Sequence, residues 1–393
     1  MHRSLAAASL ILLGFTASAS AAACGGDYGQ WLNEVKQEAI AAGVSPRTVE
    51  AAVPMMTYNK KVISRDRAQG VFAQTFLEFS GRMVSSYRLK IGGQNLKKYA
   101  AVFADIERKF GVPGPVITAF WALETDFGAV QGDFPTISAL ATLSYDCRRP
   151  DLFRPQLIAA LQLLERGDLK SSDFVGAWAG ELGQTQILPR DYLEYGIDED
   201  GDGKVDLKRS VPDVLATAGH FIQGLGWRAG EPWLQEVKVP QNMQWELARL
   251  DNRLPASQWA AMGVRRADGR ALSGSLPASL LLPMGRTGPA FLAYPNFDVY
   301  LKWNQSLVYC TTAAYLGTRL AGAQKVSPGA NPQGLSMAEM KQLQQELQQL
   351  GYDVGKVDGI LGEKTRDAVR REQLRLGMPA DAWPTHELVT RLR

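Results

Sequence analysis

The segment spanning residues 112–128 constrains the fold more than any other part of the chain. It opens with a Val-Pro-Gly-Pro turn, in which proline is placed to begin a helix. Residues 116–123 follow without a charge, and a helix that is apolar almost all round lies buried in a protein core. One carboxylate, Glu124, stands near the end of this helix, shortly before the stop residue Gly128. The pattern predicts a core helix that carries a single glutamate.

The position of Glu124 on an apolar helix has two explanations. Burying a charged carboxylate without a partner costs several kcal/mol, so the side chain either finds a cation or keeps its proton near neutral pH. The first alternative is a structural glutamate paired with an arginine. The second is a general acid, because a glutamate that holds its proton can protonate a glycosidic oxygen. This segment by itself leaves both alternatives open.

The composition is that of a globular protein and excludes several functional classes. The length of 393 residues suggests two or three domains, and 46% apolar with 21% charged residues argues against a disordered chain. A net charge of +3, with no basic run interleaved with aromatic residues and no Walker loop, argues against nucleic acid as a partner. The three histidines show no metal-ligand spacing, and none lies near a nucleophile motif.

The N-terminal residues 1–23 are predicted to be a signal peptide. Arg3 supplies the positive start, residues 5–17 form an apolar run that is too short to span a bilayer, and small residues follow. Cys24 comes next, as in a lipoprotein cleavage box that lacks the usual leucine, so anchoring to the outer membrane through Cys24 stays open. Export also permits one disulfide among Cys24, Cys147 and Cys310, with no indication of which two pair.

The rest of the chain divides into a large helical domain and a small module. Helical spacing recurs over residues 24–322, and strand alternation is weak and confined to residues 237–239 and 280–282. Residues 323–335 have the composition of a linker, rich in Gly, Pro, Ser and Asn. Residues 336–393 predict a three-helix module, and a module of this size after a linker is typically a binding appendage.

Two loops between residues 178 and 213 carry candidate binding residues. Residues 178–192 combine glycines with the amides of Gln184 and Gln186, which suits sugar hydroxyls and acetamides or, alternatively, a plain turn between helices. The next loop has the spacing of an EF-hand opening, with Arg209 where the bidentate Glu should stand, and a solvated acidic turn is the alternative. The predicted calcium ligands are Asp198, Asp200, Asp202, Lys204, Asp206 and Asp213.

An aromatic segment at residues 291–306 forms either core packing or the wall of a cleft. Its candidate sugar-binding residues are Tyr294, Asn296, Tyr300, Trp303 and Asn304, and Tyr192 and Gln186 join them from the first loop.

Taken together, these motifs resemble the lytic murein transglycosylase B family with a C-terminal peptidoglycan-binding module. The Trp-Ala-Leu-Glu-Thr-Asp-Phe-Gly stretch around Glu124 resembles the family's catalytic helix, Gln186 falls in its substrate loop, and Asn296 matches a sugar-binding asparagine. The resemblance implies a mainly α, lysozyme-like catalytic domain. It also implies a periplasmic enzyme that needs no cofactor for its chemistry, with calcium in a structural role only.

The activity that this resemblance implies is cleavage of the β-1,4 bond between N-acetylmuramic acid and N-acetylglucosamine in peptidoglycan glycan strands, with 1,6-anhydro ends as product. A lysozyme-like muramidase that hydrolyses the bond and a non-catalytic wall-binding protein remain as alternatives. We further expect a monomer that associates with the cell-wall synthesis machinery.

The sequence also departs from the family pattern. Ala177 stands where many relatives carry Ser, Ile187 replaces a common Phe, and Glu372 in the module stands where Phe is usual. Glu181 adds a second carboxylate to the substrate loop, where it either is structural or tunes Glu124.

Overall fold

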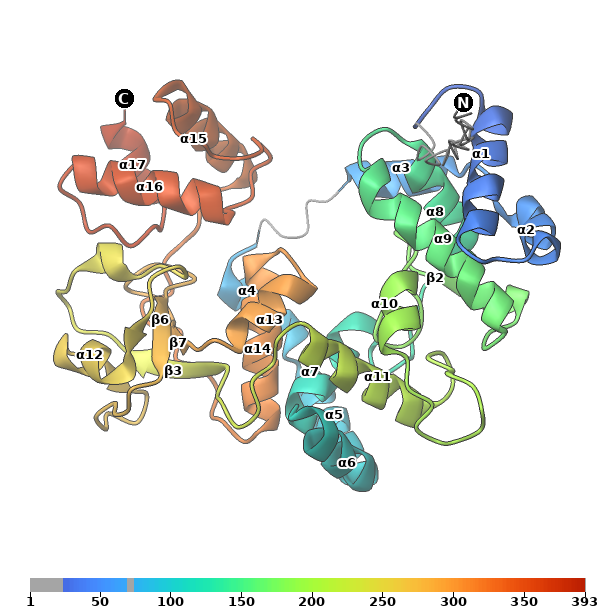
Figure 1. Cartoon of the computed structure of the whole chain (residues 1–393). Helices are drawn as coiled ribbons and strands as arrows, with labels where there is room; N and C mark the ends of the chain where they lie inside the picture. The colour runs from blue at the N-terminus through green and yellow to red at the C-terminus, as the bar shows by residue number, and fades with distance from the viewer. Residues whose placement is uncertain (1–23, 69–73, 393) are drawn as a thin grey trace, which may run out of the picture.

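The computed structural model describes residues 24–68 and 74–392, and over these ranges the chain is mainly helical, as the sequence predicted (Figure 1). The predicted signal peptide, residues 1–23, lies outside the described residues. A large hydrophobic core fills the helical body, a second core lies against a small β-sheet, and a third belongs to the C-terminal module. Within the described ranges, no helix is both long enough and apolar enough to cross a membrane.

The helical body consists of two groups of helices. The first group, at the upper right of Figure 1, comprises α1 (Tyr28–Ala41), α2 (Pro46–Ala52), α3 (Lys60–Arg67), α8 (Thr136–Tyr145) and α9 (Pro150–Arg166). The second group comprises α4 (Phe76–Met83), α5 (Ser86–Lys98), α6 (Ala100–Phe110), α7 (Gly114–Thr125), α10 (Pro189–Tyr195), α11 (Val211–Gly224), α13 (Phe297–Trp303) and α14 (Leu307–Leu320). A short antiparallel pair of strands stands where the chain passes between the two groups. β1 (Phe134–Pro135) comes just before α8, and β2 (Val175–Gly176) comes between α9 and α10.

Helix α7 is the buried helix that the sequence predicted. Residues 116–123 are all buried, and α7 packs against α5, α6, α11 and α14. The helix ends because the backbone turns left-handed at Asp126 and Phe127, with φ of 49° and 62°. An ion pair fixes this turn, since the Arg88 Nε donates to the Asp126 carboxylate at 2.7 Å. Glu124 therefore lies in the last helical turn, beside a firmly held chain reversal.

The sheet is larger than the weak strand signals predicted. Five antiparallel strands lie in the order β4-β6-β7-β3-β5, with α12 (Ala256–Ala261) following β4. β7 is buried at every position and β6 at all but the first, so the apolar residues do not alternate as they do in a half-exposed strand. The strands are β3 (Leu234–Lys238), β4 (Leu254–Pro255), β5 (Arg265–Arg266), β6 (Pro277–Leu281) and β7 (Ala290–Ala293).

The C-terminal module has three helices, α15 (Met337–Gln349), α16 (Glu363–Arg375) and α17 (His386–Arg391), as predicted. The preceding segment, residues 323–335, has the composition of a free linker but packs against the body. Val326 is buried and its N–H donates to the Tyr315 hydroxyl at 3.0 Å, while the Ala330 N–H donates to the Thr287 carbonyl at 2.8 Å.

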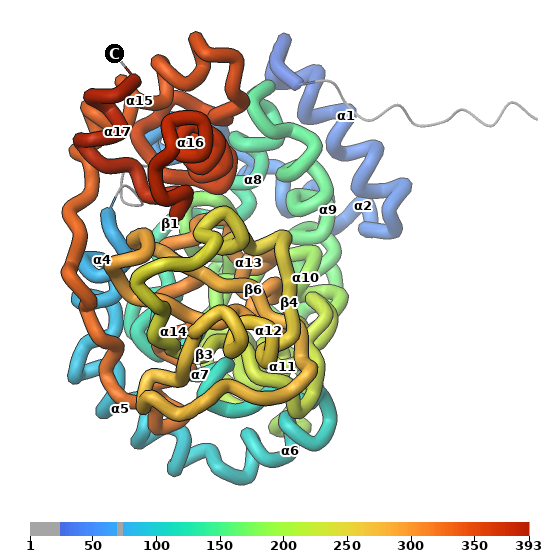
Figure 2. Tube along the Cα trace, turned by 90° about the vertical axis from the view of Figure 1, so that its left-hand side faces the viewer, coloured from blue at the N-terminus to red at the C-terminus, as the bar shows by residue number. Residues whose placement is uncertain are grey.

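Buried polar contacts dock the module beside the sheet, where both views place it (Figures 1 and 2). The Arg366 guanidinium on α16 is buried and donates to the Pro283 carbonyl at 2.6 Å, just after β6. Arg370, one turn on, donates to the Ala248 carbonyl at 3.3 Å. These arginines cap backbone oxygens of the body, so the module and the sheet form one packed unit.

The cysteines resolve the pairing that the sequence left open. Cys24 forms a disulfide with Cys147, and Cys310 is a buried thiol. A lipidated cysteine carries its lipid on the same sulfur, so a Cys24 in this disulfide cannot also be a lipid anchor. The lipoprotein alternative and the structure therefore exclude one another.

We expect the mature protein to carry the Cys24–Cys147 bond and no lipid. Non-reducing peptide mapping should recover the two cysteines in one linked peptide, with Cys310 alkylated only after denaturation because it is buried. A diacylglyceryl mass on the Cys24 peptide, with Cys147 free, would contradict the structure.

Candidate active site

The Glu124 carboxyl lies at the meeting point of three helices. Its Oε1 accepts a hydrogen bond from Trp303 Nε1 at 3.0 Å and another from the Tyr309 hydroxyl. Trp303 is the last residue of α13, and Tyr309 lies in the first turn of α14. Both donors therefore lie about 180 positions after Glu124 in the sequence. No ion pair to Glu124 occurs among the described residues. Neutral donors, rather than the arginine of the structural alternative, hold this carboxyl.

Burial sets the protonation of Glu124. Loss of water raises its pKa from 4.5 to about 7, the hydrogen bonds from Tyr309 and Trp303 pull the pKa down, and the nearby charge of Glu181 raises it. Such a carboxyl holds a proton near neutral pH and can also release it, which a general acid that later acts as a base requires. Tyr309 keeps its own proton, since burial raises its pKa well above the ordinary value.

Aromatic packing fixes the donor ring of Trp303. Its ring stacks on Phe120 of α7 with centroids 4.1 Å apart, and it meets Phe221 of α11 at 5.2 Å. These contacts come from two helices of the core, so the indole N–H has little freedom to leave the carboxyl.

The carboxyl opens into a cavity of about 320 Å³. Carboxyl, amide, ammonium and aromatic groups share its wall, which suits a ligand with hydroxyl groups and an apolar ring face. The lining residues are Glu124, Ala177, Glu181, Gln186, Ile187, Leu188, Asp191, Phe221, Lys302, Trp303 and Asn304. The structure therefore brings three of the predicted sugar-binding residues, Gln186, Trp303 and Asn304, together with Glu124.

The other four predicted sugar-binding residues do not line this cavity. Tyr192 and Tyr300 are buried in the large core, where Tyr300 stacks on Phe120. Tyr294 is buried too and donates to the Gln235 side chain at 2.7 Å, while both amide atoms of the buried Asn296 bond to the backbone. Their roles in sugar binding therefore stay predictions that this cavity does not support. An aromatic-rich segment has the same composition whether its rings face a core or a cleft.

The loop that carries Gln186 is held by its backbone. Leu182 and Ile187 form an isolated antiparallel bridge, and Gln186 itself has a φ of 52°. The Gln186 side-chain nitrogen donates to the Gly183 carbonyl at 2.7 Å, so part of its amide serves the loop itself. This bridged turn supports the interpretation of a shaped binding loop over that of a plain connection.

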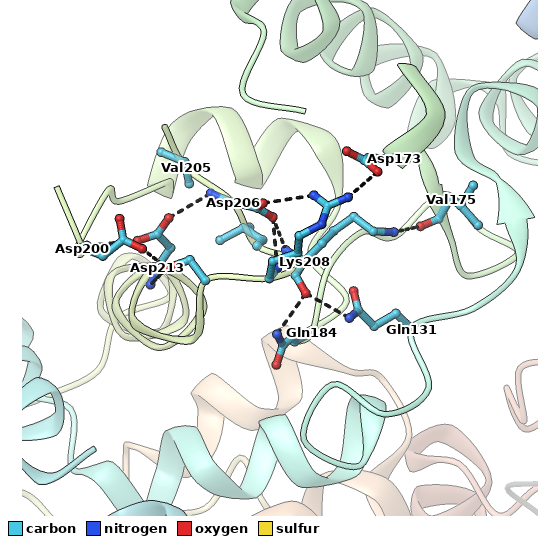
Figure 3. A network of polar contacts seen from close by, with 12 residues as sticks. Gln131, Asp173, Val175, Gln184, Asp200, Val205, Asp206, Lys208 and Asp213 are labelled. Atoms are coloured by element: carbon cyan, nitrogen blue, oxygen red, sulfur yellow. Dashed lines mark hydrogen bonds and ion pairs between the residues drawn. The ribbon is translucent and has the colours of Figure 1, made fainter. Parts of the chain in front are cut away.

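Gln184, whose amide the sequence grouped with that of Gln186 as suited to sugars, ties this loop to α7 instead. Its amide oxygen accepts from Trp121 Nε1 at 2.9 Å, and its nitrogen donates to the Lys208 carbonyl at 3.0 Å (Figure 3). Gly128 makes the approach possible, because a Cβ there would lie 2.4 Å from the Gln184 amide oxygen. Tyr309 was missed, and nothing local in the sequence marks it, since only tertiary contact brings it to Glu124.

The acidic loop brings together only part of the predicted calcium ligands. Carboxylate oxygens of Asp198, Asp200 and Asp202 lie within 4.8 Å of one another, an arrangement that fits a hard cation. Asp213 is buried instead and accepts from the N–H groups of Glu199, Asp200 and Asp206. Its carboxylate therefore supports the loop from within, and its role as a replacement ligand stays a prediction.

The remaining two predicted ligands also have other partners. Asp206, which belongs to the network of Figure 3, pairs with Arg209 at 3.1 Å, and the Lys204 N–H donates to Asp202 at 2.9 Å. The chemistry of the three clustered aspartates fits calcium, whereas these two side chains do not join them.

The class of the protein follows from comparison with known families. The chain belongs to the Transglycosylase SLT domain family, whose model matches residues 27–318. A peptidoglycan binding domain model matches residues 336–392, which corresponds to the predicted module.

Two relatives cover different shares of the chain. The membrane-bound lytic murein transglycosylase B of Escherichia coli (strain K12) is 30% identical over 221 residues, 55% of this chain and 59% of that protein. The chain thus spans about three fifths of the length of that relative. The structure of SltB3 from Pseudomonas aeruginosa, in complex with NAG-anhNAM-pentapeptide, is 35% identical with a TM-score of 0.86, and covers 94% of this chain and 100% of its own.

A more distant structure shares the fold. Escherichia coli lytic transglycosylase Slt35 in complex with calcium is 22% identical, with a TM-score of 0.64, over 76% of this chain and 95% of its own.

The protonation of Glu124 predicts a pH-dependent effect of Glu124→Gln on stability. Because the folded pKa of about 7 exceeds the unfolded value of 4.5, the site destabilises the fold increasingly as pH rises between these values. Gln carries no charge, so the variant should match the wild type at about pH 4 and exceed its free energy of unfolding by about 1–3 kcal/mol at about pH 8. Urea unfolding at both pH values measures this difference.

The matched control is Glu107→Gln, an exposed glutamate on α6, which should show no such gain. A loss of ~3–5 kcal/mol for Glu124→Gln at about pH 8 would instead indicate a broken buried ion pair.

Proposed function

We propose that this protein cleaves the β-1,4 bond between N-acetylmuramic acid and N-acetylglucosamine in peptidoglycan and leaves 1,6-anhydro ends. The observation that carries the proposal is the Glu124 carboxyl, held by Trp303 and Tyr309 at the cavity wall with a pKa near neutrality. Family membership supports it, as do the SltB3 structures with NAG-anhNAM-pentapeptide and NAG-NAM-pentapeptide.

The mechanism uses one carboxyl twice. Protonated Glu124 gives its proton to the glycosidic oxygen, and the bond to the anomeric carbon breaks as that oxygen leaves as a hydroxyl. The acetamido oxygen of the substrate relieves the developing positive charge at the anomeric carbon. The Glu124 carboxylate then takes the proton from the C6 hydroxyl, whose oxygen bonds to the anomeric carbon. The proton count closes without water, and Glu124 returns to its starting state.

Trp303 and Tyr309 serve both halves of this cycle. As neutral donors to Oε1, they stabilise the carboxylate formed after the first proton transfer without pairing it so strongly that it cannot take a proton back. The stacked Phe120 and Phe221 keep the indole in place while the charge on Glu124 changes.

Hydrolysis is the second candidate, and one observation favours it. Two further carboxyl groups, Glu181 and Asp191, line the same cavity and offer a base that could activate water. Each hydrolysed product is heavier than the corresponding anhydro product by the mass of one water, so mass spectrometry distinguishes the two outcomes.

The C-terminal module is proposed to bind the same polymer, on the strength of its match to a peptidoglycan binding domain. The periplasm is the proposed location, since peptidoglycan is the substrate and residues 1–23 have the pattern of a signal peptide. The monomeric state and the association with the cell-wall synthesis machinery stay predictions.

We expect Glu124→Gln to lower the rate of release of anhydro-muropeptides by at least ~10²–10⁴, the usual contribution of a general acid or base. Gln fills the same space and accepts the same two hydrogen bonds, but it cannot give or take the proton. Binding of glycan strands should persist. Mass spectrometry of digested sacculi, with strand binding measured in parallel, tests both statements.

Near wild-type release of anhydro ends by a folded Glu124→Gln protein would refute the assignment. Full-rate release of reducing ends by the wild type would favour the muramidase.

We also propose that the acidic loop binds calcium in a structural role. The three clustered aspartates support this, and so does the calcium complex of Slt35, whose fold the chain shares. The loop connects to the site through the Lys208 carbonyl, which accepts from Gln184 (Figure 3). Gln184 in turn accepts from Trp121 of α7. Calcium bound in this loop would thus stabilise the position of the helix that carries Glu124. The proton transfers themselves would involve Glu124 and not the cation.

Calcium should raise the melting temperature of chelator-treated protein, because a ligand that binds only the native state stabilises it. With no bidentate glutamate, we expect a Kd of about 10⁻⁴–10⁻³ M. Asp202→Ala should abolish the rise. Asp353→Ala is the control, since Asp202 and Asp353 each accept an N–H from two residues on, at 2.9 Å. An equal rise in all three proteins, or in none, would contradict a site in this loop.

A further inference from the structure

Glu181 is a carboxyl group in the cavity that the mechanism above does not use. It lines the same wall as Glu124, and its Oε2 is buried without a hydrogen-bond partner. No ion pair to either carboxyl occurs in the part of the chain that the structure describes. An unpaired buried carboxyl oxygen destabilises the fold, so its retention in a cavity calls for an explanation.

The backbone holds Glu181 in place from both sides. The Ala177 N–H donates to the Glu181 carbonyl at 3.1 Å, and Leu182 next to it forms the bridge with Ile187. Gly176 lets the chain pass this close, since a Cβ there would lie 1.9 Å from the Glu181 carbonyl oxygen. The carboxyl is thus carried by a fixed loop, not by a surface segment that could turn away.

Charged groups from four elements surround this position. Glu124 comes from α7, Asp191 from α10 and Lys302 from α13, all on the cavity wall, and Arg149 at the start of α9 acts on Glu181 from a distance. Burial raises the pKa of Glu181, while the backbone N–H groups of Glu181 and Ala179 and then the Arg149 charge lower it. With the carboxylate of Glu181 in one cavity with Glu124, simultaneous ionisation of both is disfavoured, and the two groups titrate as a pair.

We propose that Glu181 is a positioning residue that acts through Glu124, its negative charge keeping the proton on the Glu124 carboxyl until the glycosidic oxygen takes it. This inference rests on the proposed function, because it assigns Glu181 a part in the same proton transfer. The same charge becomes unfavourable once Glu124 is ionised, so it also favours the return of the proton from the C6 hydroxyl. One fixed charge therefore keeps Glu124 protonated before the first transfer and favours the second transfer.

The test is the pH dependence of kcat/KM on short soluble glycan strands. Glu181→Gln removes the charge and keeps the size of the side chain. The alkaline limb of the profile should therefore shift toward lower pH by about 0.5–1 pH unit. The rate on the acidic side of the optimum should stay close to wild type. At alkaline pH this shift corresponds to about 3–10-fold lower kcat/KM. Glu181→Asp keeps the charge and should return the limb to within a few tenths of a pH unit of wild type.

Glu107→Gln on α6 is the matched control and should leave the profile unchanged. Other roles of Glu181 predict other patterns. A structural carboxyl predicts a lower melting temperature and an equal loss of rate at every pH, and a direct sugar contact predicts a higher KM at every pH. Either pattern overturns the proposal, as does an unshifted limb in Glu181→Gln.

Glu124→Gln separates this inference from the function on which it rests. If Glu124→Gln is inactive and Glu181→Gln has a wild-type profile, only the role of Glu181 fails. If Glu124→Gln is active, the proposed function itself fails.

Discussion

The hydrogen bonds from Trp303 and Tyr309 to the Glu124 carboxyl are the interaction on which the site depends. They join the end of α7 to α13 and α14, which the chain reaches only after it has built the sheet. Because both donors are neutral, the carboxyl is held in place while its pKa stays near 7. An arginine in the same position would hold it as firmly but would fix it as a carboxylate, which has no proton to give.

The environment of α7 makes this arrangement possible. Its apolar surface is buried on every side, so the helix cannot rotate to carry Glu124 into water. The left-handed turn that follows, fixed by Arg88, lets Gln184 approach the backbone at Gly128. Gln184 then connects α7 to the loop of clustered aspartates through the Lys208 carbonyl. Stability of that loop and geometry of the carboxyl are therefore parts of one network.

The C-terminal module is packed against the body that carries the sheet. Buried arginines of α16 bond to backbone carbonyls beside β6, and the segment at residues 323–335 is hydrogen-bonded to the body instead of hanging free. A docked module of this kind would hold a bound polymer at a set distance from the cavity. A mobile module would raise only its local concentration.

The sequence by itself determined the helical class, the buried α7 with its single glutamate, and the three-helix module, because these follow from local apolar periodicity and turn residues. It also indicated Gln186 and Trp303 as cavity residues. Only the tertiary structure decided that Tyr309 reaches Glu124 and that Tyr294 and Asn296 lie away from the cavity. The reason is physical: which face of an aromatic segment meets solvent, and which distant donor meets a carboxyl, depends on packing between elements far apart in the chain.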